Sequence, residues 1–281
     1  MPAALFFFGQ ERYVPMPSYP PLDWREVTQR RRGGIGDPFI YRAEVDSTSA
    51  LAARLPPEEA PVGAAIVADH QTAGRGRLGR RWVAAPNSGL ACTVVLGPMD
   101  PPWAAPMAVG LALLETLEGL GLPASLKWPN DALIGGRKCA GILIETRRVE
   151  EETWLLGGIG INVHASDPAL PQATHLAAHS SQSLRREEVL VDLLARLEHW
   201  WARASDGPAL VRDTWAARLE TLGRTVIVQS AQGPIRGLAA GVAEDGGLVL
   251  RLANGMSTTV WAGDVTLSPG AWRDPPTVVG W

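Results

Sequence analysis

The segment QTAGRGRLGRRWVAAPNSG, residues 71–89, decides which class of α/β fold this chain can adopt. Its first three glycines match the spacing G-x-G-x-x-G, which is typical of dinucleotide-binding Rossmann folds. In those folds the glycine turn opens directly into a helix, whose N-terminus holds the pyrophosphate. Here a proline, an asparagine and another glycine follow Gly79 within ten residues, so no useful helix fits before the next predicted strand. The sequence therefore excludes a Rossmann dinucleotide site.

The same segment is nevertheless suited to binding an anion. Residues 71–82 contain four arginines, three glycines and no acid. Such a loop exposes backbone N–H groups and several guanidinium forks, which suit a polyanion such as a triphosphate. A solvated basic loop and an RGG-like nucleic-acid contact remain alternatives, because one segment alone does not distinguish them.

A second charged segment, KWPNDALIGGRKCAGILIE, occupies residues 127–145. It predicts two strands joined by a tight turn at Gly135-Gly136. This hairpin would place Lys127 and Lys138 on neighbouring strands, so that their ammonium groups converge beside Asp131. An ordinary charged hairpin is the alternative. The apolar flanks favour a ligand site, because charges at the ends of buried strands commonly line one.

Composition limits the other functions of the chain. With 281 residues, of which 46% are hydrophobic, it can form one large domain, or one large domain with a small appendage. A net charge of −3 gives no global field toward nucleic acid or membranes. No run approaches the roughly 20 apolar residues that a membrane helix needs. Cys92 and Cys139 lie in apolar runs, which indicates reduced core thiols in a cytoplasmic protein.

The pattern of elements divides the chain into four parts. Residues 1–38 form an irregular, proline-rich extension without the two-helix pattern of a helix-turn-helix, and residues 271–281 form a loose tail. Residues 39–222 alternate strand and helix patterns, including a long apolar helix over 103–121 and amphipathic helices over 186–204 and 208–223. Residues 223–270 contain short β-rich runs, with hairpin turns at Asp245-Gly246 and Asn254-Gly255, and predict a small barrel.

Five motifs, in this order and spacing, resemble the biotin protein ligases. They are STS (47–49), QTAGRGRLGRRW (71–82), KWPND (127–131), RKCAGILIE (137–145) and GIGINV (158–163). The resemblance extends from about residue 44 to residue 267 and implies an α/β fold of the α+β type. It consists of a class II synthetase-like biotin-lipoate ligase domain, whose mixed sheet is flanked by helices, followed by a small SH3-like β-barrel. The DNA-binding domain of some family members is not visible in the sequence.

The resemblance implies a two-step reaction with ATP and biotin as substrates and Mg²⁺ as the metal. The carboxylate of biotin would attack ATP to give biotinyl-5′-AMP, and a lysine of a biotin carboxyl carrier domain of acetyl-CoA carboxylase or a related carboxylase would then accept the biotin. No DNA or membrane binding is expected, and a homodimer is compatible with the family. The alternatives are a lipoate–protein ligase with the same adenylation chemistry and a non-catalytic protein that senses biotin or nucleotide, or binds nucleic acid, on the same scaffold.

The resemblance also assigns site residues by motif. Catalysis would use Lys138, Arg75, Lys127 and Asp131, and Asp131 is also the candidate for carrying Mg²⁺ or orienting the carrier lysine. Biotin would contact Ser47, Thr48, Ser49, Gln71, Arg75, Gly76, Arg77 and Lys138, although many family members carry Asn in place of Ser49. ATP or the adenylate would contact Arg75, Arg77, Trp82, Lys127, Asn130, Asp131, Lys138, Gly160 and Asn162. The residues themselves leave alternatives open, since Ser47 could cap a helix, Trp82 could be a core tryptophan, and Asn130 and Asn162 could be structural.

Overall fold

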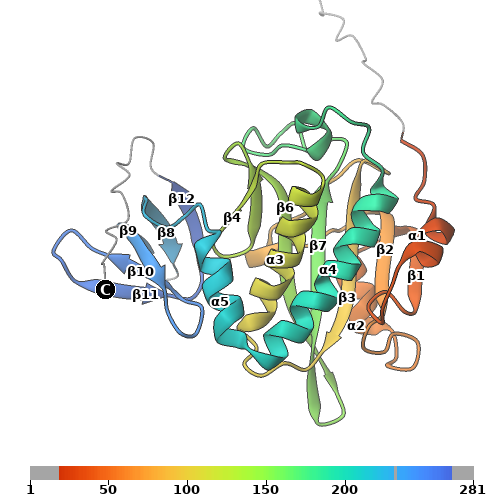
Figure 1. Cartoon of the computed structure of the whole chain (residues 1–281), viewed down its shortest axis with the longest axis horizontal. Coiled ribbons are helices and arrows are strands. Elements are labelled where there is room, and N and C mark those ends of the chain that lie inside the picture. The colour runs from red at the N-terminus through yellow and green to blue at the C-terminus, as the bar shows by residue number, and fades with distance from the viewer. Residues whose placement is uncertain (1–18, 231–232, 268–281) are drawn as a thin grey trace, which may run out of the picture.

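The computed structural model describes residues 19–230 and 233–267, and the expectations for residues 1–18 and for the tail lie outside this range. A large mixed sheet with its helices is followed by a smaller antiparallel sheet (Figure 1). The large sheet contains β1 (Phe39–Val45), β2 (Ala65–Gln71), β3 (Gly89–Gly97), β4 (Ala124–Lys127), β5 (Asp131–Ile134), β6 (Arg137–Val149) and β7 (Glu152–Asn162). The helices are α1 (Trp24–Arg30), α2 (Thr48–Arg54), α3 (Ala104–Gly119), α4 (Arg186–Asp206) and α5 (Pro208–Ala217).

The large sheet has the strand order β1-β2-β3-β7-β6-β5-β4. Only β1 and β2 run parallel, and every other neighbouring pair is antiparallel. The predicted mixed α/β sheet is therefore confirmed. The strands β3, β7 and β6 occupy the middle of the sheet, where their apolar side chains are buried on both faces.

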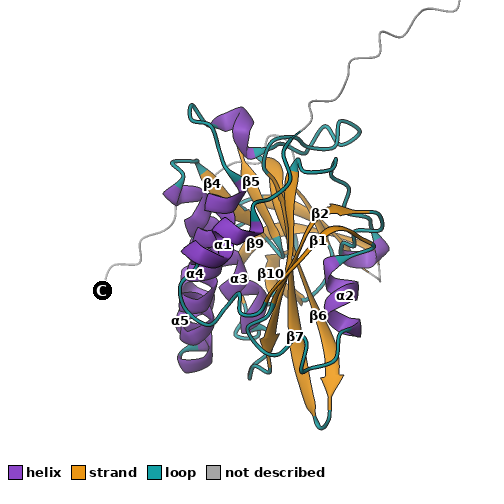
Figure 2. Cartoon of the chain, turned by 90° about the vertical axis from the view of Figure 1, so that its right-hand side faces the viewer, coloured by secondary structure: helices purple, strands orange, loops and turns teal. Residues whose placement is uncertain are grey.

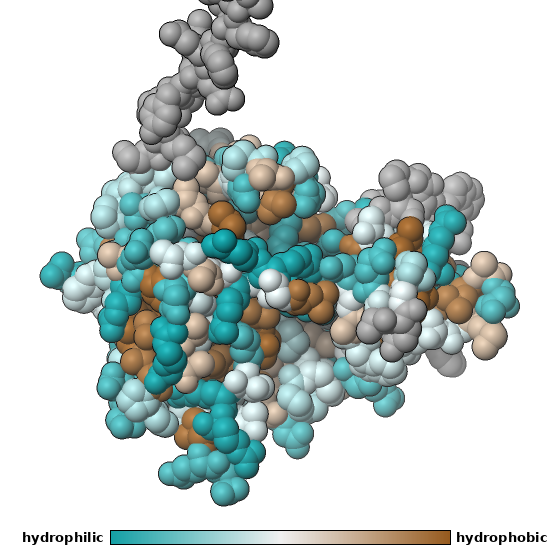
Figure 3. Space-filling view, turned by 180° about the vertical axis from the view of Figure 1, so that it is seen from behind, coloured by the Kyte–Doolittle hydropathy of each residue, from teal (hydrophilic) through white to brown (hydrophobic). Residues whose placement is uncertain are grey.

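Helices cover the two faces of this sheet unequally. Figure 2 shows α3, α4 and α5 on one face and α2 on the other. The helix α3 is apolar on all sides because it is packed between the sheet and the outer helices. Gly110 allows a close approach to α5, since a Cβ there would lie 3.1 Å from Nε1 of Trp215. Figure 3 shows the opposite side of the molecule, where apolar residues are interspersed with hydrophilic ones. No helix in the described part of the chain is long and apolar enough to cross a membrane.

The expectation of an irregular N-terminal extension is wrong for Trp24–Arg30, which forms α1. The carboxylate of Asp23 caps this helix by accepting hydrogen bonds from the backbone N–H groups of Arg25 and Glu26. Val27 is buried and joins the main core. The sequence did not predict this helix, because prolines precede its capping residue and only Val27 of its seven residues is buried.

The C-terminal part is a five-stranded antiparallel sheet, as expected for an SH3-like unit. Its order is β11-β10-β9-β8-β12. The strands are β8 (Thr225–Ser230), β9 (Gly233–Val242), β10 (Leu248–Arg251), β11 (Ser257–Val260) and β12 (Asp264–Leu267). Both predicted hairpin turns are confirmed, and Gly246 and Gly255 adopt φ values of +85° and +83° there.

The connection between the two parts is bonded to the large sheet. The N–H of Leu126 in β4 donates to the carbonyl of Arg218 at 3.2 Å, and the N–H of Glu220 donates to the carbonyl of Leu126 at 2.8 Å. The backbone N–H of Trp128 donates to Oγ1 of Thr221 at 3.0 Å, and its indole N–H donates to the carbonyl of Gly246 at 3.3 Å. The outer edge of β4 is therefore covered by the segment that leads into the small sheet.

Candidate active site

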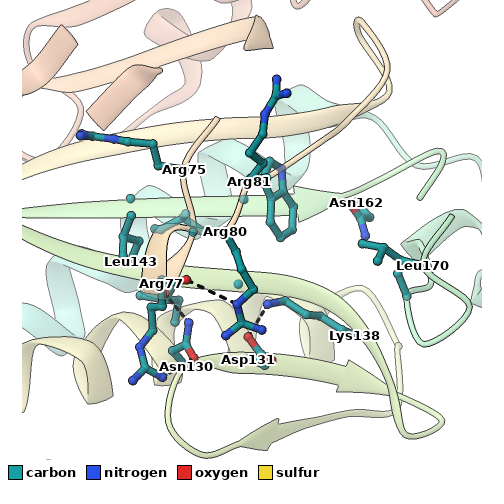
Figure 4. A pocket seen from close by; sticks show the side chains of 18 of the residues that line it. Arg75, Arg77, Arg80, Arg81, Asn130, Asp131, Lys138, Leu143, Asn162 and Leu170 are labelled. Carbon is teal, nitrogen blue, oxygen red and sulfur yellow. Dashed lines mark hydrogen bonds and ion pairs between the residues drawn. The ribbon is translucent and has the colours of Figure 1, made fainter. Parts of the chain in front are cut away.

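A cavity of about 720 Å³ lies between the large sheet, the loop after β2 and the last strand of the small sheet. It collects side chains from every motif singled out in the sequence, and Figure 4 shows some of them. From those motifs its wall contains Ser47, Thr48, Ser49, Gln71, Arg75, Gly76, Arg77, Trp82, Lys127, Asn130, Asp131, Lys138, Gly160 and Asn162. All fourteen candidate residues thus border one cavity, although they come from positions more than a hundred residues apart.

The strand side of the cavity carries the two lysines and one carboxylate. Nζ of Lys138 lies 2.5 Å from Oδ1 of Asp131, and Figure 4 shows the two side chains pointing toward each other. The backbone of Lys138 is held as well, because its N–H donates to the carbonyl of Gln172 and its carbonyl accepts from Thr174, both at 2.8 Å. Lys138 is therefore presented from a strand whose position is fixed on both sides.

The expectation that Lys127 and Lys138 lie on neighbouring strands is wrong. The chain reverses at Trp128-Pro129 and makes three strands instead of two, so that β5 lies between the strands of the two lysines. Proline cannot donate to a strand ladder, which favours a turn at this point. Asp131 consequently begins β5, opposite Lys127 of β4 and beside β6. The two lysines therefore reach the cavity from the strands on either side of Asp131.

Two asparagines support the wall of the cavity through backbone contacts. Nδ2 of Asn130 donates to the carbonyl of Ile142 at 2.7 Å, and its Oδ1 accepts from Arg77 at 3.1 Å. Nδ2 of Asn162 donates to the carbonyl of Thr174 at 3.0 Å. The side-chain amide of each asparagine therefore donates a hydrogen bond to a backbone carbonyl.

The arginine loop, residues 72–88, connects β2 to β3 without an α-helix. Arg77–Gly79 makes a single 3₁₀ turn in which Leu78 has a φ of 55°. The loop closes on itself through hydrogen bonds from Gly76 N–H to the carbonyl of Arg80 and from Trp82 N–H to the carbonyl of Gly74. This geometry confirms that the G-x-G-x-x-G spacing does not make a dinucleotide-binding turn.

All four arginines of this loop border the cavity, and each has a partner. Arg81 donates to the carbonyl of Thr72 at 2.8 Å. Arg75 binds Oε2 of Glu145 at 2.9 Å, and Arg80 binds the carboxylate of Asp264 in β12. Arg77 is more buried, and this desolvation lowers the pKa of its guanidinium, while the charges of Asp264 and Asp131 raise it. Sequence reasoning missed Glu145 and Asp264 as partners because they lie 70 and 184 positions from the arginines that they bind.

Trp82 forms part of the cavity wall and is not one of the buried core tryptophans. Its ring packs on the glycine surface of β7, since a Cβ at Gly160 would lie 2.5 Å from Cε2 of Trp82. Gly141 of β6 lies beneath the same ring, and Nζ of Lys138 is 5.7 Å from its centroid. The glycines thus make room for an aromatic ring beside the catalytic cation candidate.

The N-terminal end of α2 forms the neutral side of the cavity. Oγ of Ser47 accepts from the N–H of Ala50, so this serine caps the helix as one sequence alternative proposed. The backbone N–H and the hydroxyl of Thr48 donate to Oε1 of Gln71 at 2.8 and 3.1 Å. Oγ of Ser49 lies 3.1 Å from Oγ1 of Thr93, a buried residue of β3 that the sequence analysis missed. Its signal was a hydroxyl within the otherwise apolar run LACTVVLG.

Both cysteines are free and buried, as predicted. Burial raises the pKa of Cys92 and of Cys139 to about 12, so both remain thiols at neutral pH. Cys139 follows Lys138 but faces the core. The structure therefore gives no support to a cysteine nucleophile in this cavity. Among the described residues, no group of three or more His, Cys, Asp or Glu side chains could hold a metal ion.

Comparison with known proteins identifies the family. The model of the biotin/lipoate A/B protein ligase family matches residues 40–163, and that of the biotin protein ligase C terminal domain matches residues 221–268. The biotin--[acetyl-CoA-carboxylase] ligase of Mycobacterium tuberculosis is 35% identical over 263 residues, which cover 88% of this chain and 96% of that protein. The chain belongs to the biotin protein ligase family.

Other family members agree in sequence and in structure. The biotin--[acetyl-CoA-carboxylase] ligase of Paracoccus denitrificans is 35% identical over 74% of this chain and 92% of its own length. The structure of the biotin protein ligase from Aquifex aeolicus in complex with biotin and ATP has a TM-score of 0.71 with this chain, at 30% identity over 82% of this chain and 97% of that one. The family resemblance inferred from the five motifs is therefore confirmed, and with it the predicted fold.

Proposed function

We propose that this chain is an ATP-dependent biotin–protein ligase that transfers biotin to a lysine of a carrier domain. The observation that carries this proposal is the convergence of Lys138, Lys127 and the arginine loop on one cavity whose opposite side is lined by neutral hydroxyl and amide groups. A cationic side suits a carboxylate and a triphosphate, and a neutral polar side suits the ureido group of biotin. The relatives named above, one of them in complex with biotin and ATP, support the same reaction.

In the first step, a carboxylate oxygen of biotin attacks the α-phosphorus of ATP. A bond forms between that oxygen and phosphorus, and the bond from phosphorus to the bridging oxygen of pyrophosphate breaks. Two anions must approach each other, so repulsion must be neutralised and the charge on the leaving pyrophosphate stabilised. We assign the central position to Lys138, which would contact both the biotin carboxylate and the α-phosphate, and we assign the remaining phosphates to Lys127.

The arginine loop would complete the site around the adenylate. We assign Arg75, Gly76 and Arg77 to the biotin carboxylate and the phosphate, and Trp82 to the adenine ring. Arg75 lines the cavity and pairs with Glu145, and both side chains are partly exposed, so that exchanging this carboxylate for a phosphate would cost little. Closure of the loop would exclude water from the reactive anhydride.

The other assignments concern biotin recognition and the shape of the site. Ser47, Thr48, Ser49 and Gln71 would hydrogen-bond the polar end of biotin, and the existing bonds between Thr48 and Gln71 hold two of these groups in place. Gly160 and Asn162 would border the adenylate, with Asn130 joining them from the turn before β5. Gly160 contributes by lacking a side chain, and the two asparagines contribute mainly by shaping the wall.

In the second step, the amine of the carrier lysine attacks the carbonyl carbon of biotinyl-5′-AMP, an amide bond forms, and AMP leaves. The attacking nitrogen loses a proton to solvent as the amide bond forms. Asp131 is the carboxylate beside Lys138 and is our candidate for orienting this amine. The carrier would be the biotin carboxyl carrier domain of acetyl-CoA carboxylase or of a related carboxylase.

Mg²⁺ is proposed as the metal of the adenylation step. It prefers oxygen ligands and commonly binds through one or two carboxylates together with substrate phosphates and water. Asp131 brings a carboxylate of this kind to the cavity and is the residue that would share the ion with ATP. When bound, the metal would lower the charge of the triphosphate.

Three finer proposals concern the state of the protein. A cytoplasmic location is supported by the two buried free thiols. A homodimer would have an available edge in β1, the outer strand of the large sheet, and light scattering tests it. DNA binding is not proposed, and a gel-shift titration with duplex DNA tests that expectation.

The deciding experiment is the exchange of labelled pyrophosphate into ATP. We expect exchange that depends on biotin and that is absent with lipoate, followed by transfer of labelled biotin to an isolated carrier domain. Exchange with lipoate alone would replace the proposal with a lipoate–protein ligase. Binding of biotin without any exchange would favour a sensor on this scaffold.

A further inference from the structure

A buried ion pair lies behind the cavity, outside all five motifs. Nη1 of Arg186 in α4 lies 2.8 Å from Oδ1 of Asp69 in β2, and the two side chains are only 4% and 5% exposed. Burying two charges is costly unless further hydrogen bonds satisfy both groups. The contacts of this pair therefore indicate what it holds together.

The pair holds both stems of the arginine loop. Asp69 lies two residues before Gln71, where β2 ends and the loop begins. The returning stem is bound to the same place, because the N–H of Asn87 donates to the backbone carbonyl of Asp69 at 3.0 Å and Nη1 of Arg186 donates to the carbonyl of Gly89 at 3.2 Å. The outgoing and the returning chain are thus tied to one buried pair.

The remaining contacts of the pair come from β1 and from the N-terminal strap, residues 19–23. The hydroxyl of Tyr41 donates to Oδ2 of Asp69 at 2.5 Å. The N–H of Leu22 points at both carboxylate oxygens of Asp69, at 3.2 and 3.3 Å, and Nη2 of Arg186 donates to the carbonyl of Pro20 at 2.8 Å. The strap therefore donates a hydrogen bond to the carboxylate of Asp69 and accepts one from the guanidinium of Arg186.

The strap also reaches the stem of a second loop of the cavity, residues 164–173. The ring of Tyr19 stacks on that of His164 with centroids 4.8 Å apart. The N–H of His164 donates to the carbonyl of Ser88 at 2.8 Å, which joins this stem to the returning stem of the arginine loop. Asp167, Leu170 and Gln172 of the second loop line the cavity.

From these contacts we infer that Asp69 and Arg186, together with the strap, are positioning residues that hold both cavity loops ready to bind the adenylate. The inference rests on the proposed function of the cavity. The pair does not border the main cavity and touches no reacting atom, so it acts through the loop stems. Loosening the stems would lower the fraction of molecules with a binding-competent loop. The apparent affinity for substrates would fall in proportion, while the rate of a fully bound molecule would change little.

The test uses the full chain with two clamp variants. Arg186→Lys keeps the cation but cannot reach the acceptors on Asp69, Gly89 and Pro20 together. Tyr41→Phe removes one donor to Asp69 and keeps the ring. We expect the KM for biotin and for ATP to rise about tenfold in Arg186→Lys and about threefold in Tyr41→Phe, with kcat nearly unchanged. Amide hydrogen exchange should become faster in both loops of the free protein.

A matched substitution serves as the control. Arg185→Lys alters the neighbouring arginine, which is 48% exposed and binds Glu26 instead of Asp69. This variant should retain the wild-type KM values and the exchange rates of both loops.

A lower melting temperature of Arg186→Lys with unchanged KM values and unchanged exchange of the loops would overturn the inference, since the pair would then only stabilise the fold. The proposed function fails separately, when the wild-type protein gives no biotin-dependent exchange of pyrophosphate. In that case the hydrogen-exchange comparison still decides whether the pair holds the loops.

Discussion

The two halves of the cavity are built on different principles. On one side, Lys127, Asp131 and Lys138 stand on strands whose backbone hydrogen bonds fix them without any ligand. On the other side, Arg75 and Arg80 stand on a loop and rest on carboxylates of β6 and β12. In the proposed reaction, the strand half would be arranged before any substrate binds, whereas the arginines of the loop half would exchange carboxylate partners for the entering anion.

The energies of the two halves differ accordingly. The side chains of Arg75 and Arg80 are 42% and 59% exposed in their ion pairs. Exposed pairs of this kind contribute about 0–1 kcal/mol, so a triphosphate can displace the carboxylates easily. Lys138 and Asp131 are less exposed, at 34% and 18%, and they cannot leave their strands. Substitutions in the strand half should therefore damage catalysis more than substitutions in the loop half.

The largest effect is expected for Lys138→Ala. Loss of the central cation should lower the rate of biotinyl-adenylate formation by about a thousandfold or more, because the two reacting anions are no longer bridged. Biotin-dependent pyrophosphate exchange measures this rate. Lys138→Arg is the control that retains the charge, and it should recover part of the activity. A near-normal rate in Lys138→Ala would remove this lysine from its central role.

Gly160→Ala should have the next largest effect, because it acts where the two halves meet. The new Cβ would lie 2.5 Å from Cε2 of Trp82 and would push the ring away from the sheet. We expect the KM for ATP to rise about tenfold while kcat changes less, since the ring is assigned to the adenine. Gly241→Ala is a matched control on β9, where a Cβ would meet nothing within 4 Å. Equal KM values for the two variants would contradict the assignment of Trp82.

A smaller change of opposite sign is expected for Asp264→Asn. This substitution releases Arg80 from its resting carboxylate, so that ATP no longer has to displace it. The KM for ATP should fall by about two- to threefold, and the free energy of unfolding should change by less than about 1 kcal/mol. Arg80→Gln is the complementary variant, in which the KM for ATP should not fall. A large rise of KM in Asp264→Asn would mean that Asp264 binds substrate or metal directly.

The smallest effect concerns the pH dependence of stability caused by two histidines, one at each end of the second loop or just beyond it. Burial, followed by the charge of Arg186, lowers the pKa of His164, and burial lowers that of His175. The folded protein therefore favours the neutral imidazoles. The stability that the two neutral imidazoles contribute is complete above the unfolded pKa of about 6.5. It is lost as the pH falls below that value toward the lower pKa of the folded protein.

Because both rings are partly exposed, the loss should stay below about 1 kcal/mol. Denaturant unfolding at pH values from about 7.5 down to about 5, the range in which histidine titrates, measures this loss of stability. In the double variant His164→Gln/His175→Gln this part of the pH dependence should disappear. An unchanged pH profile would show that other groups determine it.

Local patterns were enough to predict much of the fold. The missing helix after Gly79 excluded the dinucleotide fold, and the pairs Asp245-Gly246 and Asn254-Gly255 marked two hairpin turns correctly. These features depend on backbone conformations that neighbouring residues determine. The five motifs also predicted which residues would border one cavity, although their roles stay proposals.

Features that depend on distant contacts could not be predicted in this way. The break at Trp128-Pro129 divides what had the pattern of one strand, because the new turn is bonded to Thr221 and to the small sheet. The resting partners of Arg75 and Arg80 come from other strands. The burial of Asp69 and Arg186 depends on an N-terminal strap whose proline-rich sequence indicated no structure.

The connection between the two sheets is hydrogen-bonded to β4, and this has a practical consequence for expressing the protein as separate fragments. Cutting the chain where α5 ends, at Ala217, would strip hydrogen-bond partners from Leu126 and Trp128, next to the turn that carries Asn130 and Asp131. The two fragments would not be independent modules, and the larger one would expose a strand edge prone to aggregation. The turn between β6 and β7, where the side chain of Glu151 is 99% exposed, is a better place to split or tag the chain.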